Sequence, residues 1–387
     1  MFSVRYQPGR VAQLVARPQM PGSGLVGNAV RSGDVIALAL ALILAAAPPA
    51  ATAAEVTPAL PDNVYAATVG PELSPAVAGM PELVYVPNAV SNTVDVIDPR
   101  TYQIVDHYPV GREPHHITPS WDLSRLYVLN TKSDSLTVID PHTGKVTGTI
   151  AVTDPYNLYF TPDGSTAIVV AERYNRLDFR DPATWALRGS VAIPHSGADH
   201  LDFSADGRYL LVSCEYAGWI VKVDVPSRRV TGEVHVGGLP VDVKLSPDGK
   251  LFYVANQGRH GVSIIDPLAM KETGFLPTGR GAHGLYVSRD TRLLYATNRL
   301  GGSISVIDLA TREVVRTWKI GGSPDMGGIS PDGAQFWVSG RYNHEVYVVD
   351  TRSGRLVRTI RVGAQPHGLA LFPQPGRYSL GHTGVYR

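Results

Sequence analysis

The chain has 387 residues, 44% of them hydrophobic, and a formal net charge of only +1. A balance so close to neutral excludes a global electrostatic field that would draw the protein to nucleic acid or to an anionic membrane. The single cysteine, Cys214, excludes an intramolecular disulfide, a cysteine-rich zinc site and the C-x-x-C-H attachment of a c-type haem.

The N-terminal part of the chain carries the pattern of an export signal. Residues 35–47 form an uninterrupted apolar run of 13 residues, followed by Pro48, Pro49 and small residues at 51–54. Such a run is too short to span a bilayer but suits a signal peptide, which we expect over 35–54 with cleavage after Ala53 or Ala54. An uncleaved amphiphilic anchor is the alternative. We interpret 1–34 as an unstructured extension with the true start near Val35, and 55–80 as a linker or outer wrap. The mature protein is then exported, whether secreted, periplasmic or on the cell surface, and has no transmembrane helix.

Seven aspartates recur at nearly constant spacing, each at the end of a short β-branched run. The steps between them are 42, 41, 43, 42, 42 and 42 residues, and the aspartates are Asp98, Asp140, Asp181, Asp224, Asp266, Asp308 and Asp350. A period near forty with four strand-like segments per copy is typical of a β-propeller, in which each repeat forms one blade. We therefore predict an all-β fold, a seven-bladed β-propeller over residues 81–376.

The repeat from 240 to 281 shows how one blade is built. Strands are predicted at 241–245, 251–255, 262–265 and 272–277, giving four antiparallel strands per blade. Pro247, Asp248 and Gly249 form an explicit turn between the first two, because proline presets φ, aspartate bonds local backbone and glycine accepts positive φ. The second strand is apolar on both faces and should lie inside the sheet stack, whereas the charged fourth strand should form the outer edge.

The order of segments along the chain predicts how the ring closes. No inner-strand segment precedes the first clear strand at 83–86, whereas the apolar segment 366–372 follows the seventh outer strand. We expect 366–372 to supply the innermost strand of the blade that begins at residue 83, which removes exposed sheet edges at the seam. Residues 377–387 are then a C-terminal tail.

Four second-strand segments share a short motif. Residues 85–88 read YVPN, 127–130 YVLN, 253–256 YVAN and 295–298 YATN. With the Val-Ile-Asp ends that follow, the segment 81–376 resembles the YVTN repeat family of bacterial propellers, also called YncE-like. The resemblance implies a propeller among relatives that include exported binding proteins, the d-type haem domain of nitrite reductases and, more remotely, propeller lactonases. Such relatives differ widely in function.

The first residues of the innermost strands depart from the structural repeat. Equivalent positions see equivalent surroundings, so a purely structural repeat would place similar residues there. Instead the first positions are His115, Tyr156, Asp199, Val241, His283, Asp325 and His367, and the next are His116, Asn157, His200, Asp242, Gly284, Met326 and Gly368. Because innermost strands line the central channel, these side chains should converge at one mouth of it. The loops after the second strands reach the same end and carry Arg173, Arg259, Arg299 and Arg341.

Imidazoles and carboxylates bordered by guanidinium groups make a credible ligand pocket. The predicted ligand-binding residues are His115, His116, Asp199, His200, Asp242, His283, Asp325, His367 and the four arginines. His115, His283, His367, Asp199 and Asp325 could bind a divalent metal. The same set could instead hold a tetrapyrrole, act as acid and base on a lactone, or form a hydrated channel mouth whose members satisfy one another. No complete catalytic signature and no nucleic-acid motif is present, so we expect a monomeric binding or interaction module for a small ligand or an extracellular or cell-surface protein.

Overall fold

The structure, a computed structural model, describes residues 62–382 and 384–387. These residues belong to a compact unit that spans 58–387. The expected extension at 1–34, the signal peptide at 35–54 and the first part of the linker lie outside the described residues. Within the described residues, no helix has the length and apolar character needed to cross a membrane.

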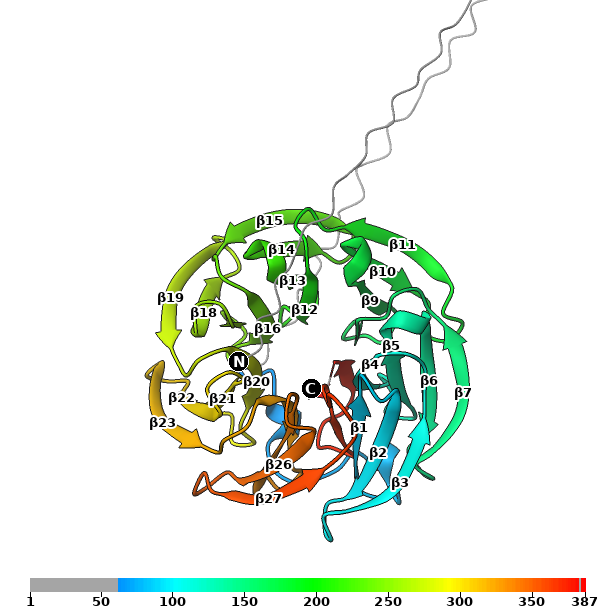
Figure 1. The fold of residues 1–387 in the computed structure, drawn as a ribbon. Helices are drawn as coiled ribbons and strands as arrows, with labels where there is room; N and C mark the ends of the chain where they lie inside the picture. The colour runs from blue at the N-terminus through cyan, green and yellow to red at the C-terminus, as the bar shows by residue number, and fades with distance from the viewer. Residues whose placement is uncertain (1–61, 383) are drawn as a thin grey trace, which may run out of the picture. The chain divides into compact units, whose positions relative to one another are not determined.

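The described strands form seven antiparallel sheets arranged as blades of a propeller around a central channel (Figure 1). The first three blades, from the channel outward, contain β28 (Ala370–Phe372), β1 (Leu83–Asn88), β2 (Thr93–Asp98) and β3 (Gln103–Pro109); β4 (Pro114–Pro119), β5 (Leu126–Asn130), β6 (Ser135–Asp140) and β7 (Lys145–Ala151); and β8 (Asn157–Phe160), β9 (Ala167–Ala171), β10 (Arg176–Arg180) and β11 (Leu187–Ala192). The next two contain β12 (Ala198–Phe203), β13 (Tyr209–Cys214), β14 (Trp219–Asp224) and β15 (Arg229–His235); and β16 (Pro240–Leu245), β17 (Phe252–Asn256), β18 (Gly261–Asp266) and β19 (Lys271–Pro277). The last two contain β20 (Ala282–Val287), β21 (Leu293–Asn298), β22 (Ser303–Asp308) and β23 (Glu313–Lys319); and β24 (Pro324–Ile329), β25 (Gln335–Gly340), β26 (Glu345–Asp350) and β27 (Leu356–Arg361). The predicted seven-bladed propeller is confirmed.

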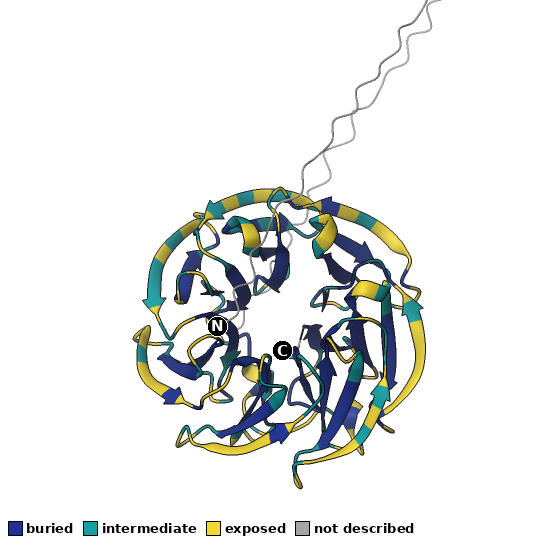
Figure 2. Ribbon diagram, viewed as in Figure 1, coloured by how far each residue is buried: buried dark blue, intermediate teal, exposed yellow. Residues whose placement is uncertain are grey.

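Burial falls from the channel side to the rim of each blade (Figure 2). The second strands β5, β9 and β17 are buried at every residue, because each sheet is covered by a neighbour on both faces. The fourth strands β7 and β23 are mostly exposed and carry charges along the outer edge. Apolar clusters between adjacent blades make up the core.

The ring closes where the sequence predicted. Strand β28 pairs with β1, with Val84 opposite Leu371 and Tyr85 opposite Ala370. The last described strand of the propeller repeat therefore completes the first blade, and no sheet edge is exposed at the seam.

The channel-side edges of the inner strands are satisfied by side chains from the preceding blade. The backbone N–H of Leu245 donates to Oδ2 of Asp202 at 2.8 Å, and that of Leu285 donates to Oδ2 of Asp242 at the same distance. The N–H of Leu201 likewise donates to the hydroxyl of Tyr159 at 3.0 Å. Buried backbone donors need such partners, so part of the polar character of the inner strands is structural.

Residues 377–387, expected as a tail, instead enter the channel. They form β29 (Ser379–Gly381) and β30 (Val385–Tyr386), which extend the third blade inward from β8, and the Nη2 atom of Arg387 donates to Oδ1 of Asp202 at 3.0 Å. The unpaired edge of β8 offers backbone groups that this segment satisfies. Figure 1 shows the C-terminus near the centre of the ring.

The described part of the expected linker packs against the blades. It contains the short helices η1 (Ala66–Thr68) and η2 (Pro75–Val77), and Tyr65 donates its hydroxyl to the carbonyl oxygen of Leu245 at 2.8 Å. Val64, Tyr65 and Val77 are buried. This segment therefore covers the end of the inner strands that lies away from the predicted mouth.

Candidate functional site: a histidine cluster on the channel axis

The structure brings the predicted histidines and aspartates together at one end of the channel. They sit at the beginnings of five inner strands, β4, β12, β16, β20 and β24, and in the segment before β28. All are at most 5% exposed: His115, His116, Asp199, His200, Asp242, His283, Asp325 and His367. Because every inner strand begins at the same end of the ring, residues far apart in sequence share one small volume. We call the histidines of this group, together with His382, the axial cluster.

Imidazole rings in the axial cluster contact one another directly. The ring centroid of His115 lies 4.1 Å from that of His367, and the ring of His116 lies 4.8 Å from His367 and 5.3 Å from His200. Tyr156 borders the group, with its ring 4.6 Å from that of His115. Such separations are ordinary contacts between rings, so the histidines pack as a single unit.

Two sets of three histidines have metal-ligand spacing. One consists of His115, His116 and His367, and the other of His116, His200 and His382. Within each set the potential ligand nitrogens lie within 4.8 Å of one another. Zinc binds imidazole nitrogen at about 2.0–2.1 Å, so the nitrogens of a closed tetrahedral site lie roughly 3.4 Å apart. A shift of about an ångström in the rings would bring either set to that spacing.

The two adjacent histidines of β4 have buried nitrogens without partners. Neither ring nitrogen of His115 or of His116 makes a hydrogen bond to a described residue, and all four atoms are shielded from solvent. A buried polar group without a partner is costly, commonly about 1–3 kcal/mol. Such groups in a native protein call for an unseen water, ion or ligand.

Asp325 holds the other side of the cluster. Its Oδ2 atom accepts a hydrogen bond from Nδ1 of His367 at 2.6 Å, and its Oδ1 atom accepts one from Nε of Arg299 at 2.7 Å. The Nδ1 atom of His283 lies 3.0 Å from the same Oδ1, while Arg299 also donates to Nε2 of His283. With Nδ1 of His367 protonated, its Nε2 atom is the nitrogen that can accept an ion. A carboxylate behind a ligand histidine is the usual outer-shell arrangement in metal sites.

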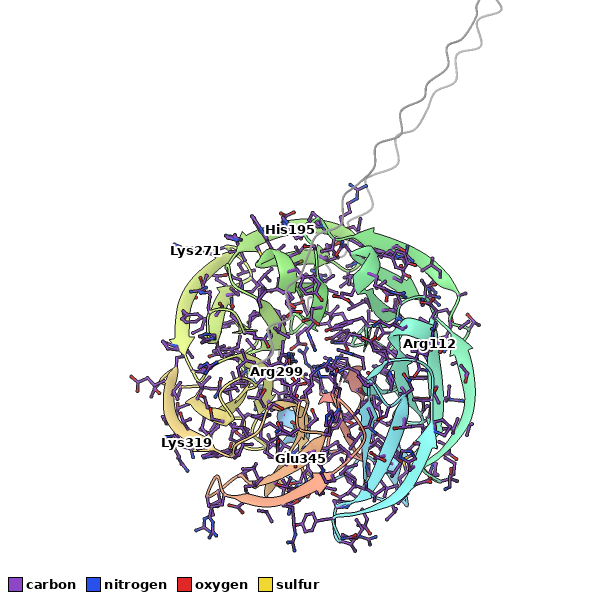
Figure 3. All side chains as sticks on the ribbon, in the orientation of Figure 1. Arg112, His195, Lys271, Arg299, Lys319 and Glu345 are labelled. Carbon is purple, nitrogen blue, oxygen red and sulfur yellow. The ribbon has the colours of Figure 1, made fainter. Side chains whose placement is uncertain are left out.

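Only two of the four predicted arginines reach the cluster. Arg299 is buried against Asp325, and Nη1 of Arg341 lies 3.8 Å from Oδ2 of the same residue. Figure 3 labels Arg299 close to the centre of the ring and His195 and Lys271 at its periphery.

The other two arginines are held at the rim by carboxylates outside the cluster. Arg173 donates to Asp154 at 2.6 Å and to Asp134 at 2.7 Å, and Nη1 of Arg259 lies 2.7 Å from Glu272 on the outer strand β19. Arg299 and Arg341 each follow their second strand directly, whereas Arg173 and Arg259 stand two and three residues after theirs. The different loop positions and the nearest carboxylates together decide where each guanidinium points.

Most of the cluster histidines are held neutral. Burial lowers the pKa of His115, His116 and His367 well below the ordinary range, and neighbouring imidazoles or Arg341 add to the effect. Burial also lowers the pKa of His283 to about 4. A neutral imidazole has a lone pair to give a metal, so this set is chemically prepared for one. Asp325 stays ionised, since Arg299 and the histidines outweigh its burial and keep its pKa well below normal.

The second set of three differs in charge. Burial alone would lower the pKa of His200, but Asp199, whose Oδ1 atom lies 2.7 Å from Nδ1, and Asp242 raise it overall. His200 therefore favours a proton over a metal. His382 completes this set, with Nε2 3.5 Å from Oδ1 of Asp242. It lies in the segment predicted as a tail, and no local pattern in the sequence marks it as a channel residue.

Acidic groups border the cluster on the side of Asp199. Burial and the charge of Asp199 raise the pKa of Glu215 to about 7, and burial also raises the pKa of Glu172. Both residues begin short helices, η5 (Glu215–Ala217) and η4 (Glu172–Tyr174), that follow second strands. The mouth thus combines neutral imidazoles with a carboxyl group that can exchange protons near neutral pH.

Comparisons with known proteins agree with the fold. A family model described as YNCE-like beta-propeller matches residues 42–375. No curated protein matches the sequence significantly.

Several solved structures share the propeller at low sequence identity. Hydrazine synthase of Kuenenia stuttgartiensis superposes with a TM-score of 0.61 at 22% identity, covering 69% of this chain and 92% of that one. The dihydro-heme d1 dehydrogenase NirN, solved in complex with DHE, has a TM-score of 0.59 at 19% identity, covering 77% of this chain and 76% of the other. A functionally unknown protein from Desulfotomaculum acetoxidans has a TM-score of 0.64 at 16% identity, covering 74% of this chain and 98% of that one. Similarity at this level establishes the fold and leaves the ligand to the site itself.

Proposed function

The chain belongs to the YNCE-like β-propeller family, whose fold serves unlike functions, and on that premise we propose that it is an exported binding protein for a divalent transition-metal ion. The ion is held on the channel axis by His115, His116 and His367. Export rests on the apolar run at 35–47 and the small residues after it.

The observation that carries the proposal is the pair of unsatisfied histidines on β4. Their four buried nitrogens have no partner among the described residues. A third histidine with a carboxylate behind it completes a set whose ligand nitrogens lie within 4.8 Å of one another. Three neutral imidazoles suit zinc, copper, nickel or cobalt better than the oxygen-loving magnesium or calcium. They also leave a coordination position open, which a water or a small ligand could take.

We favour this set over the one that contains His200 and His382 because of protonation. His115, His116 and His367 are all neutral by virtue of burial, whereas the pKa of His200 is raised beside Asp199. A metal would have to displace the proton of His200, which weakens binding near neutral pH.

A tetrapyrrole does not fit among these histidines. A planar macrocycle inserted between two rings needs about 7 Å, two van der Waals contact distances, whereas the centroids of His115 and His367 are 4.1 Å apart. Strands β29 and β30 also occupy the channel beside β8. The arrangement therefore supports a single ion better than a haem.

Titration of chelator-treated protein with Zn²⁺, Ni²⁺ and Co²⁺, followed by calorimetry and by the visible spectrum of Co²⁺, tests the proposal. We expect one ion per chain with micromolar or tighter affinity. Single His115→Gln, His116→Gln and His367→Gln variants should each bind at least tenfold more weakly, the change produced by losing about 1.4 kcal/mol.

Control variants make the assignment specific. His142→Gln alters an exposed turn after β6 and should bind like the wild type. His200→Gln and His382→Gln should stay within a few-fold of it. Loss of binding in these two but not in His115→Gln would move the ion to the other set, and absence of binding for all three metals would sink the proposal.

A further inference from the structure

A polar cavity lies at the opposite end of the inner strands from the axial cluster. It has a volume of about 70 Å³ and is lined from the inner strands β16, β20 and β24 and from residues 384–386. Along β16, Asp242 belongs to the cluster end and Lys244, two residues further on, lines the cavity. The two sites therefore occupy opposite ends of the same strands.

Two cationic side chains, Lys244 and Arg289, line this cavity. Its described lining residues include no carboxylate. Lys244 is only 5% exposed, yet its ammonium group makes no hydrogen bond and no ion pair within 4 Å with a described residue. Asp242 acts on it only through space, with Lys244 helping to lower the pKa of that buried acid against the effect of burial. Lysine is almost never so buried without a partner, so the side chain faces a space where an anion is expected.

Arg289 contributes a second positive charge. Its Nε and Nη2 atoms donate to the carbonyl oxygens of Ser330 and Ile329 at 3.1 and 3.0 Å, and Nη2 also contacts Gln374. These partners are neutral, and burial lowers the pKa of Arg289 to about 10 although Tyr386 and Asp332 oppose that change. A partly buried guanidinium bonded only to neutral groups retains attraction for an anion.

Tyr386 supplies an unused donor at the same place. Tyr386 is 5% exposed and lines the cavity, and its buried hydroxyl makes no hydrogen bond to a described residue. Leu371 and Val385 form apolar parts of the wall. The lining of the cavity therefore combines cationic and hydrogen-bonding groups with hydrocarbon.

We propose that this cavity binds a small organic acid, with its carboxylate between Lys244, Arg289 and the hydroxyl of Tyr386 and its short apolar body against Leu371 and Val385. A water needs roughly 10–15 Å³, so the volume suits several waters or one small anion and is far below that of a nucleotide site. The apolar wall favours a carboxylic acid over free phosphate, which would leave that wall uncovered. This site does not depend on the metal proposed above.

Calorimetric titration of the full chain with propanoate and, separately, with inorganic phosphate tests the assignment. Propanoate should bind, and Tyr386→Phe should weaken its binding about tenfold, the typical effect of losing a hydrogen bond to a charged group. Because that hydroxyl has no other partner, the variant should fold as well as the wild type. Lys244→Met should remove detectable binding.

Lys250→Met is the matched control, since Lys250 is exposed on the turn that follows β16. It should bind propanoate like the wild type. A chelator should leave the propanoate affinity of the wild type unchanged, which separates this site from the axial cluster. If the wild type does not bind propanoate, or if Tyr386→Phe and Lys244→Met both bind it as tightly as the wild type, the proposed site is wrong. Phosphate binding tighter than propanoate, lost in Lys244→Met, overturns the carboxylic-acid assignment.

Discussion

The Nδ1 atom of His367 lies 2.6 Å from Oδ2 of Asp325, although the two residues are 42 positions apart, one in the segment before β28 and the other on β24. This contact fixes the proton of His367 on Nδ1 and leaves Nε2 as the nitrogen that can bind an ion. It links the charge of Asp325 to the proposed metal site. The same fully buried carboxylate forms an ion pair with Arg299 and contacts the neutral imidazole of His283.

Asp325→Asn should reduce both stability and metal affinity. The variant leaves Arg299 buried without its carboxylate, and loss of one partner from a buried pair costs about 3–5 kcal/mol. It also weakens the outer-shell hydrogen bond to His367, which should lower Zn²⁺ affinity about 10–100-fold. Urea unfolding and Zn²⁺ calorimetry measure the two effects.

Asp106→Asn breaks a solvent-exposed pair with Lys145 and should change the free energy of unfolding by less than about 1 kcal/mol. Equal effects of the two variants would contradict the role given to Asp325.

The metal-free protein should lose stability as the pH falls from about 6.5 to 4. Burial lowers the pKa of His283 to about 4, whereas an unfolded chain protonates histidine below about 6.5. In this window the unfolded state binds more protons, so the free energy of unfolding decreases on acidification. Between pH 7.5 and 5, protonation of His283 alone should lower the free energy of unfolding by roughly 2 kcal/mol.

His200 has the opposite effect on the pH dependence of stability. Its pKa is raised in the folded protein, so its stabilising contribution is present below the unfolded value and disappears as the pH rises through the folded value. The net slope should still favour neutral pH, because His115, His116 and His367 act like His283. Unfolding by guanidinium chloride in the presence of chelator, at pH 7.5 and at pH 5, measures this change in stability. A protein equally stable at both values would contradict neutral burial of the cluster.

The fold was predictable from sequence because its signals are local and repeated. In the repeat from 240 to 281, strands predicted at 241–245 and 272–277 are observed as Pro240–Leu245 and Lys271–Pro277. The turn between the first two strands forms as its residues dictate. Ser246 donates to Oδ1 of Asp248 at 2.6 Å, and Gly249 has φ of 71°. Alternation of apolar residues and explicit turn chemistry need no knowledge of distant parts of the chain.

The candidate site was predictable only in part. Register-equivalent positions indicated His115 and Asp325, because the repeat itself fixes where an inner strand begins. His382 could not be found this way, since its place depends on Gly381 pairing with Tyr159 of β8, a long-range contact without a sequence pattern. Arg173 and Arg299 lie in equivalent loops but at different positions within them, and their directions also depend on carboxylates that lie far away in sequence.

Leu380→Ala should destabilise the propeller from within the channel. Leu380 belongs to β29, is 1% exposed and packs in the cluster that contains Phe203 and Leu201. Removing its side chain should cost about 2–5 kcal/mol in the free energy of unfolding, as for other buried leucines. Leu356→Ala, at an exposed position of β27, should cost no more than about 0.5 kcal/mol. Denaturant midpoints that coincide for the two variants would show that β29 does not pack in the channel.

Gly327→Ala tests how tightly the inner strands hold the channel end of a blade. A Cβ added to Gly327 in β24 would clash with the carbonyl oxygen of Trp337 in β25, which is backbone and cannot turn aside. The N–H of Gly327 also donates to the hydroxyl of Tyr286 at 2.6 Å. We expect a loss of about 1–3 kcal/mol from overpacking. We also expect weaker Zn²⁺ binding, because Asp325 lies two residues earlier on the same strand.

Gly148→Ala on the outer strand β7 is the matched control, since an added Cβ there meets nothing within 4 Å. It should unfold at the same urea concentration as the wild type or at a slightly higher one. If Gly327→Ala proved as stable as Gly148→Ala, the close approach of β24 and β25 would be refuted, and with it the rigid placement of Asp325.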